Sequence, residues 1–281
     1  MNKTILGLII FLLTADSLGA ARDSEWFMRT PMQKSFNALM IKQPKVAWWE
    51  LVSALNRHDI AVEHWLPLKE TILKESNCGQ ILYNAFGNLN KGFKLSIISR
   101  QGFSNQGYQI KLSIDQKTIN GSFQLLSPKK EVVLSGGIDE DASYQEWETD
   151  ELLIKPIAGL YYLTFNGFET PIVVSNYHSE RWLERITQFS DKISVSLPNL
   201  ANGCDPATTG FHWFNEDYQQ IGKKIIANVE GNTVKVSPAK IPHGAEFLSV
   251  SALIYELQSG VRVEYIHRIS MPFALYVEDD N

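Results

Sequence analysis

The spacing of apolar residues changes near Gly87, and this change limits the folds open to the chain. Before Gly87 the apolar residues recur at helical spacing, and one stripe at i, i+3, i+4 and i+7 comprises Trp48, Leu51, Val52 and Leu55. From Gly92 onward apolar and polar residues alternate, which is the period of a strand with one buried face. The sequence therefore predicts a mostly β protein with an N-terminal helical part.

The helical part is predicted over residues 22–87. Thr30-Pro31 is typical of an N-cap followed by the first helical residue, and Pro44 is expected to open a second helix. Asp59 can cap a third segment, which Pro67 either restarts or kinks. Asn77-Cys78-Gly79 is expected to stop it. Because so few short helices cannot form a solenoid, we expect them to act as a cap that buries its apolar stripe on another part of the protein.

The first β region is predicted over residues 92–176. Its candidate strands are 94–99, 108–114, 122–126, 131–134, 151–155, 159–165 and 171–175. Turn chemistry at Asn120-Gly121, Ser135-Gly136-Gly137 and Asn166-Gly167 separates several of them. Short strands punctuated in this way favour an immunoglobulin-like antiparallel β-sandwich.

A connecting helix is predicted over 177–190, because Ser179 can cap a face formed by Trp182, Leu183, Ile186 and Phe189. A second sandwich is predicted over 191–281. Its candidate strands are 193–197, 211–215, 223–229, 233–237, 246–257, 261–269 and 273–277. The clearest hairpin has its turn at Ser259-Gly260.

Residues 1–21 have the pattern of a cleavable signal peptide. Lys3 supplies the positive charge, an apolar run follows from Ile5 to Leu13, and Gly19 and Ala21 suit a signal-peptidase site. The run is shorter than the roughly 20 apolar residues that span a bilayer, and no later stretch reaches that length. We therefore expect a periplasmic protein, with secretion as the second choice and no membrane span in the mature chain.

The net charge of −5 gives no electrostatic reason to bind nucleic acid. The two cysteines, Cys78 and Cys204, each adjoin a glycine, as suits turn positions that a bridge can reach. In an oxidising compartment they are expected to form a disulfide; the alternative is two unrelated free thiols. A bridge would tie the helical cap to the start of the second sandwich.

No catalytic motif is present. The sequence lacks a His-Glu-x-x-His pair, a Gly-x-Ser-x-Gly elbow, a phosphate-binding loop and a dinucleotide fingerprint. His212 with Glu216 and Asp217 is a weak metal or acid–base constellation. The acidic run 139–141 with 150–151 is a weak calcium candidate. Both patterns are more typical of surface residues, so no enzyme activity, cofactor or metal site is predicted.

The seven tryptophans admit two interpretations. Core and inter-domain packing is favoured. The functional alternative is a contact surface for protein or saccharide, with Trp48, Trp49, Phe211 and Trp213 as its candidate residues.

The residues that carry a family likeness are the signal peptide, Trp26-Phe27, Thr30-Pro31, Trp48-Trp49, Trp65-Leu66-Pro67 and Asn77-Cys78-Gly79, followed by a β-rich remainder. The chain resembles a periplasmic family of unknown function from marine gamma-proteobacteria, one that includes an accessory product of the Vxr envelope-stress two-component operon. The likeness implies an exported protein near a cell-envelope signalling system and assigns no catalytic residue.

Three functions remain open at the level of sequence. The leading expectation is a non-catalytic envelope protein that acts through protein–protein contacts, with a histidine-kinase sensor domain as a candidate partner. A carbohydrate- or peptidoglycan-binding module that uses exposed aromatic residues is the alternative. An envelope hydrolase with dispersed carboxylates is the third, because glycosidase carboxylates have no local signature.

Overall fold

The computed structural model describes residues 30–82, 92–102, 106–115, 119–175, 177, 181–186, 192–198, 204–217, 219–235 and 241–271. The predicted signal peptide 1–21, Trp26-Phe27 and the predicted strand 273–277 lie outside these residues. No helix in the described part of the chain is both long and apolar enough to cross a membrane.

Three helices come first, as the helical spacing predicts. They are α1 (Gln33–Met40), α2 (Pro44–Arg57) and α3 (Val62–Glu75), and a short 3₁₀ turn, η1 (Gln80–Leu82), follows. Pro44 is the first residue of α2, as expected. Thr30 and Asp59 are not caps: Met32 and Ala61 occupy the positions before α1 and α3. Pro67 lies within one continuous α3, which ends just before Asn77-Cys78-Gly79.

The remainder of the described chain is β-structure. Its strands are β1 (Phe93–Gln101), β2 (Gln106–Ile114), β3 (Gly121–Leu126), β4 (Val132–Ile138), β5 (Gln145–Glu148), β6 (Gly159–Phe165), β7 (Phe168–Val174), β8 (Leu183–Arg185), β9 (Lys192–Val195), β10 (Thr208–Phe214), β11 (Gln220–Ile226), β12 (Thr233–Lys235), β13 (Phe247–Gln258) and β14 (Val261–Met271).

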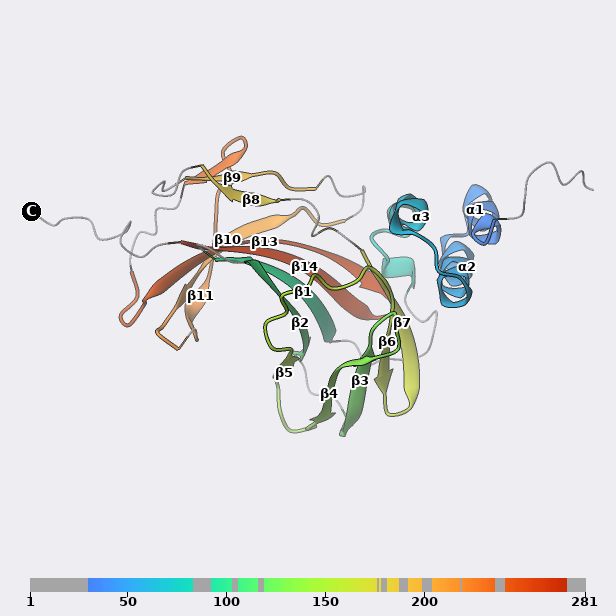
Figure 1. Cartoon of the computed structure of the whole chain (residues 1–281), viewed down its shortest axis with the longest axis horizontal. Coiled ribbons are helices and arrows are strands. Elements are labelled where there is room, and N and C mark those ends of the chain that lie inside the picture. Colours follow the sequence, from blue (N-terminus) through green and yellow to red (C-terminus); the bar gives the residue numbers. More distant parts are fainter. Residues whose placement is uncertain are drawn as a thin grey trace, which may run out of the picture.

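These strands form three sheets. The largest has the order β11-β10-β13-β14-β1-β2-β5 and curves strongly, with the four-stranded sheet β4-β3-β6-β7 and the three-stranded sheet β12-β9-β8 beside it (Figure 1). Within the large sheet β1 runs parallel to β14, and Leu95 lies opposite Val263. The hairpin β13–β14 turns at Ser259-Gly260, as predicted, and both residues have the positive φ that a two-residue hairpin turn requires.

The two predicted sandwiches are therefore not separate units. Strands β1, β2 and β5 come from the first predicted sandwich, yet they share a sheet with β10, β11, β13 and β14 from the second. The sheets also share one hydrophobic core. Alternation predicts that a strand has a buried face, but it does not determine which strand lies beside it, so the boundary at residue 176 was wrong.

Two local predictions were also wrong. Part of the predicted connecting helix, residues 183–185, forms β8, because Trp182 and Leu183 are buried in the sheet core rather than on a helical face. The predicted strand 151–155 makes only an isolated bridge at Leu152, and the edge strand β5 lies just before it.

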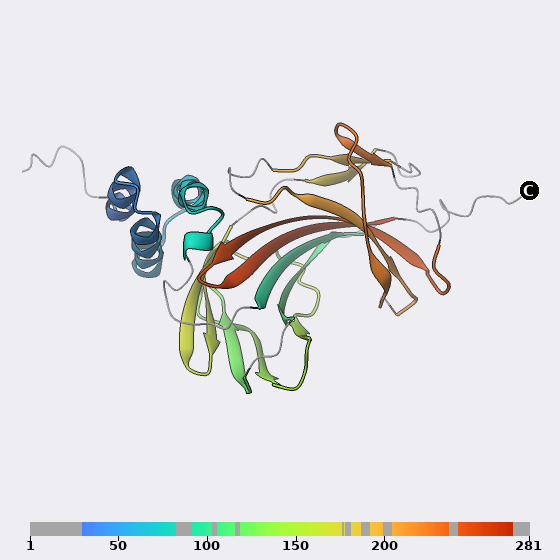
Figure 2. The same ribbon diagram turned by 180° about the vertical axis from the view of Figure 1, so that it is seen from behind.

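The helices pack at one end of the molecule, with α1 and α2 beyond α3 as seen from the sheets (Figure 2). A second hydrophobic core lies between them and the four-stranded sheet. It contains Trp48, Leu51 and Trp65 from the helices together with Leu160, Tyr162 and Val173 from β6 and β7. The helices thus form a cap on the β-structure, as the sequence predicts.

Candidate functional site

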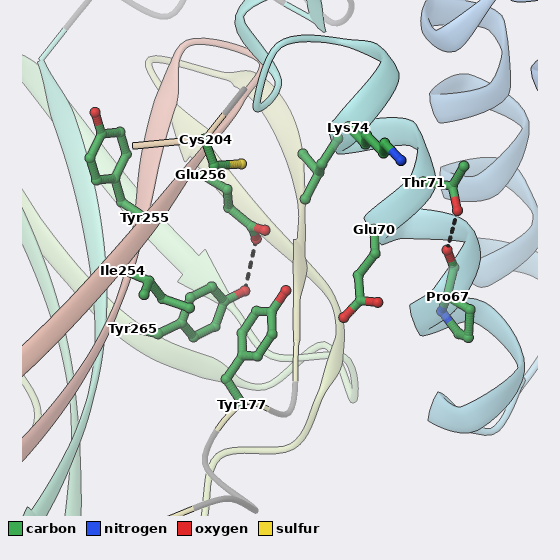
Figure 3. A pocket seen from close by; sticks show the side chains of 11 residues that line it. Pro67, Glu70, Thr71, Lys74, Tyr177, Cys204, Ile254, Tyr255, Glu256 and Tyr265 are labelled. Atoms are coloured by element: carbon green, nitrogen blue, oxygen red, sulfur yellow. Dashed lines mark hydrogen bonds between the residues drawn. The ribbon is translucent and has the colours of Figure 1, made fainter. Parts of the chain in front are cut away.

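A cavity of about 320 Å³ lies where α3 meets the β13–β14 hairpin. Its walls are Pro67, Glu70, Thr71, Leu73 and Lys74 from α3, Ile254, Tyr255, Glu256 and Tyr265 from the hairpin, and Tyr177 and Cys204. Figure 3 shows Tyr177 and Glu70 pointing toward one another across the cavity, with Glu256 and Tyr265 on the same side as Tyr177. Aromatic and acidic groups beside a cavity make it a candidate binding or catalytic site.

Lys69 precedes the cavity residue Glu70 on α3, and its side chain is completely buried. Its ammonium group donates to Ser175 Oγ, to Glu256 Oε1 at 2.5 Å and to Tyr265 Oη at 3.4 Å. An ammonium group has three donors, and all three have acceptors here. No donor of Lys69 remains for a ligand.

Glu256 Oε1 is the centre of the network. Besides Lys69, it accepts hydrogen bonds from Tyr265 Oη at 2.9 Å and from Gln258 Nε2 at 2.7 Å. Gln258 also pairs with the backbone of Val173, accepting from its N–H at 2.7 Å and donating to its carbonyl at 2.9 Å. A side chain on β13 thus bonds to β7 in the way that a neighbouring strand would.

Burial sets the protonation behaviour of this cluster. It lowers the pKa of Lys69, and the charge of Glu256 opposes that change. Burial and the nearby Glu256 raise the pKa of Tyr265 well above its usual value, so its hydroxyl keeps its proton near neutral pH. A fully bonded lysine and a phenol that does not ionise are poor acid–base catalysts. The arrangement instead joins α3, β7 and the β13–β14 hairpin.

The disulfide between Cys78 and Cys204 lies at the same junction, with Cα atoms 4.7 Å apart, and it confirms the predicted pairing. The Cys78 carbonyl also accepts a hydrogen bond from the N–H of Leu257 at 3.0 Å. The bridge therefore connects the segment after α3 to the segment before β10, beside the end of β13.

The predicted contact aromatics do not form one exposed surface. Trp48 is buried on the apolar stripe of α2. Phe211 and Trp213 share the inward face of β10, where both are buried in the sheet core. Trp49 alone of the four is exposed, at 48 %. For Trp48, Phe211 and Trp213 the favoured interpretation, core packing, is confirmed.

The two weak constellations are not assembled as sites. No group of three or more His, Cys, Asp or Glu is placed to hold a metal ion among the residues with described coordinates. In the run 139–141, Asp139 Oδ1 accepts from the N–H of Asp141 at 2.9 Å, which closes a local turn. His212 bonds to Gln220 Oε1 at 3.1 Å, and burial lowers its pKa to about 4.

Sequence reasoning missed the Lys69 network, although two signals pointed to it. Lys69 falls on the buried stripe of α3 between Leu68 and Ile72, where an apolar residue is expected. Glu256 and Gln258 follow Ile254 at two-residue spacing, on positions of β13 that face the interior. Polar residues at apolar positions of two elements are candidates for mutual pairing.

Together these features define a mostly β protein capped by helices, with one disulfide and a buried polar network where the cap meets the β-structure. The chain belongs to the protein family of unknown function DUF2861, whose profile matches residues 26–274.

Comparison with curated proteins found no match. A comparison of structures found similarity to the BSP domain of a biofilm-associated protein, with 10 % identity over 71 % of this chain and 32 % of that one. The chain thus spans about a third of that structure. The TM-score is 0.21, and at that value the similarity supports no statement about fold or function.

Proposed function

We propose that this is a non-catalytic exported protein that binds another protein of the cell envelope through an apolar surface on α1 and α2. The observation that carries the proposal is the exposure of large apolar side chains there: Phe36, Met40, Ile41, Val46 and Trp49. Met40 is 82 % exposed. Exposed apolar residues that are gathered rather than scattered mark interaction sites, and tryptophan and methionine are frequent anchors in them.

The packing between α1 and α2 explains why these side chains face outward. The two helices meet through small buried residues, Ser35 and Ala38 on α1 and Ala47 on α2, and Ser35 Oγ donates to the Ala47 carbonyl at 2.6 Å. Small residues fill the contact, so larger side chains are left on the outer sides. On α1, Phe36 and Met40 lie at i and i+4; on α2, Val46 and Trp49 lie at i and i+3, so each pair shares a helix face.

Export is supported by the signal-like pattern of residues 1–21 and by the disulfide, since disulfides persist in oxidising compartments. We therefore propose a periplasmic location. The family likeness favours the sensor domain of an envelope-stress histidine kinase as partner, with the protein acting as an accessory of that system. Of the four aromatic residues predicted as a glycan-binding surface, Trp49 is the one that is exposed, because Trp48, Phe211 and Trp213 are buried.

The test measures binding between the oxidised mature protein and the purified periplasmic sensor domain of the Vxr-type kinase by biolayer interferometry. We expect Met40→Asp and Trp49→Asp to raise the Kd by more than about tenfold, as loss of an interface anchor does. The matched control is Phe168→Asp at the start of β7, an exposed apolar position whose exposed fraction lies between those of Trp49 and Met40, which should change the Kd by less than about twofold.

The same variants are tested with soluble peptidoglycan fragments. No binding of the sensor domain, or equal losses in all three variants, contradicts the proposal. Saturable binding of peptidoglycan fragments that Trp49→Asp abolishes, without sensor-domain binding, would replace it with the glycan-binding alternative.

A further inference from the structure

Two arginines lie side by side on the large sheet, on the face opposite its hydrophobic core. In the parallel pairing of β1 with β14, Arg100 lies opposite Arg268, so both side chains leave the same face of adjacent strands. Like charges directly opposite one another destabilise a sheet unless something neutralises them. This pair is therefore a feature that needs a counter-charge.

The donors of the two guanidinium groups are largely unused. The Nε atoms of Arg100 and Arg268 are buried and bond to no acceptor. Arg100 donates one hydrogen bond from Nη2 to Gln109 Oε1. Arg268 lies over the ring of Phe214, 5.6 Å from its centroid, and neither arginine makes an ion pair with a carboxylate among the described residues. Buried unsatisfied donors are costly, so a native structure that retains them calls for an explanation.

A third cation extends toward the same place. Lys224 of β11 lies across Gly210 of β10, where a Cβ atom would come within 2.4 Å of Lys224 Cε. Gly210 lies opposite Ser251 of β13, and Ser251 lies opposite Arg268. One row across the sheet thus places Lys224, Arg268 and Arg100 in sequence. His212, which also faces this side, is neutral near neutral pH because burial and Arg268 lower its pKa to about 4.

The acidic groups on this face offset the positive charge of the row only in part: Glu148 acts on Arg268, and Glu264 acts on Lys224, through charge alone. Glu264 accepts from Ser96 Oγ at 2.9 Å and pairs with Arg262 at 2.8 Å. Glu146 pairs with Lys111 at 3.1 Å. Glu148 lies on the edge strand β5, and Glu151 lies over Gly107, opposite Arg100, yet neither forms an ion pair with Arg100 or Arg268 in the described structure.

We propose that Arg100 and Arg268 form a binding site for an oxyanion, a carboxylate or phosphate group, with Lys224 completing its positive surroundings. The planar guanidinium offers paired N–H donors that match the oxygens of either group, and two adjacent guanidinium groups can hold one anion between them. All three side chains keep partial exposure to solvent, so the anion has access. Its charge would remove the repulsion between the arginines, and its oxygens would accept hydrogen bonds from the guanidinium groups.

The test follows the arginine ¹⁵Nε–¹Hε resonances of the intact oxidised protein by NMR while inorganic phosphate or acetate is added at constant ionic strength. We expect saturable shifts in two arginine signals, assigned to Arg100 and Arg268 by their loss in Arg100→Lys and Arg268→Lys. Each lysine variant keeps the positive charge and removes the paired N–H donors of the guanidinium group. It should raise the Kd of the preferred anion at least about fivefold in calorimetry. Arg181→Gln, which removes a distant exposed arginine, is the control and should bind as the wild type does.

Comparison of inorganic phosphate with acetate shows which oxyanion group the site prefers. Tighter binding of phosphate assigns the site to phosphate groups, and tighter binding of acetate assigns it to carboxylates. No saturable shift with either anion overturns the proposal, as does equal binding by the wild type and both lysine variants. Folding of each variant is checked by the dispersion of its backbone amide spectrum.

Discussion

Among the glycines that the structure describes, Gly79 has the shortest contact at its Cβ position. Its φ is +85°, and a Cβ atom there would lie 1.7 Å from the Leu257 carbonyl oxygen on β13. Replacement by alanine must therefore separate the disulfide-bearing turn from β13. We predict that Gly79→Ala lowers the free energy of unfolding by at least about 3 kcal/mol, measured by urea denaturation.

Gly244→Ala is the matched control for Gly79→Ala. Gly244 has a similar φ of +78°, but nothing lies within 4 Å of its Cβ position. Its replacement should cost only the backbone strain of about 1 kcal/mol. Equal losses in the two variants would show that the contact with Leu257 contributes nothing.

The ion pair between Lys69 and Glu256 leads to a second prediction about the stability of single-residue variants. Lys69→Met leaves the buried Glu256 carboxylate without its cation, so we expect a loss of about 3–5 kcal/mol in the free energy of unfolding. In the double variant Lys69→Met/Glu256→Gln the uncompensated charge is gone, so part of that loss should be recovered. A double variant less stable than Lys69→Met would contradict the assigned pairing.

Among the secondary-structure elements, those with strong local patterns could be predicted and those that depend on distant partners could not. The β13–β14 hairpin has clear alternation and a Ser259-Gly260 turn, and it was predicted correctly. The β5 edge strand is short and polar, so it has little apolar signal. Trp182 and Leu183 have spacing compatible with a helix, but the stacking of Trp182 on His267 of β14 places them beside a sheet.

His267 of β14, which stacks on Trp182 just before β8, predicts that the free energy of unfolding depends on pH. Burial, with Lys155 nearby, lowers the pKa of His267 to about 4, against 6.5 for an unperturbed histidine. Between these pH values the unfolded chain binds more protons than the folded protein, so the free energy of unfolding falls as the pH falls. We expect His267 to account for a loss of about 3 kcal/mol from pH 7 to pH 4.

His267→Gln isolates that contribution. Urea denaturation at several pH values should show a shallower pH dependence in the variant than in the wild type. Part of the slope should persist, because the pKa of His212 is lowered in the same direction. A slope unchanged by His267→Gln would mean that His267 titrates alike in the folded and unfolded states.

At the scale of the whole molecule, local periodicity predicted the class of fold but not its connections. The parallel pairing of β1 with β14 joins the beginning and the end of the β-structure, and no local pattern encodes it. The same distinction applies to the residues at the junction of α3 with the β13–β14 hairpin. Its disulfide was predictable from composition and from the expectation of export, because two cysteines allow only one internal pairing. The Lys69–Glu256 pair was not, because each residue finds its partner only through the folded arrangement.

The disulfide is expected to decide how firmly the cap is held on the β-structure. It closes a loop with a sequence separation of 126, for which the chain-entropy model gives about 4–5 kcal/mol. We predict that the double variant Cys78→Ser/Cys204→Ser loses most of this free energy of unfolding in urea denaturation. The Lys69 network and the Leu257–Cys78 backbone hydrogen bond should still hold α3 against β13 in the variant, because they do not depend on the thiols. Adding Gly79→Ala to it should then cost less than in the bridged protein, since the unbridged turn can move away from Leu257. Fully additive losses would show that the bridge and the turn stabilise the junction independently.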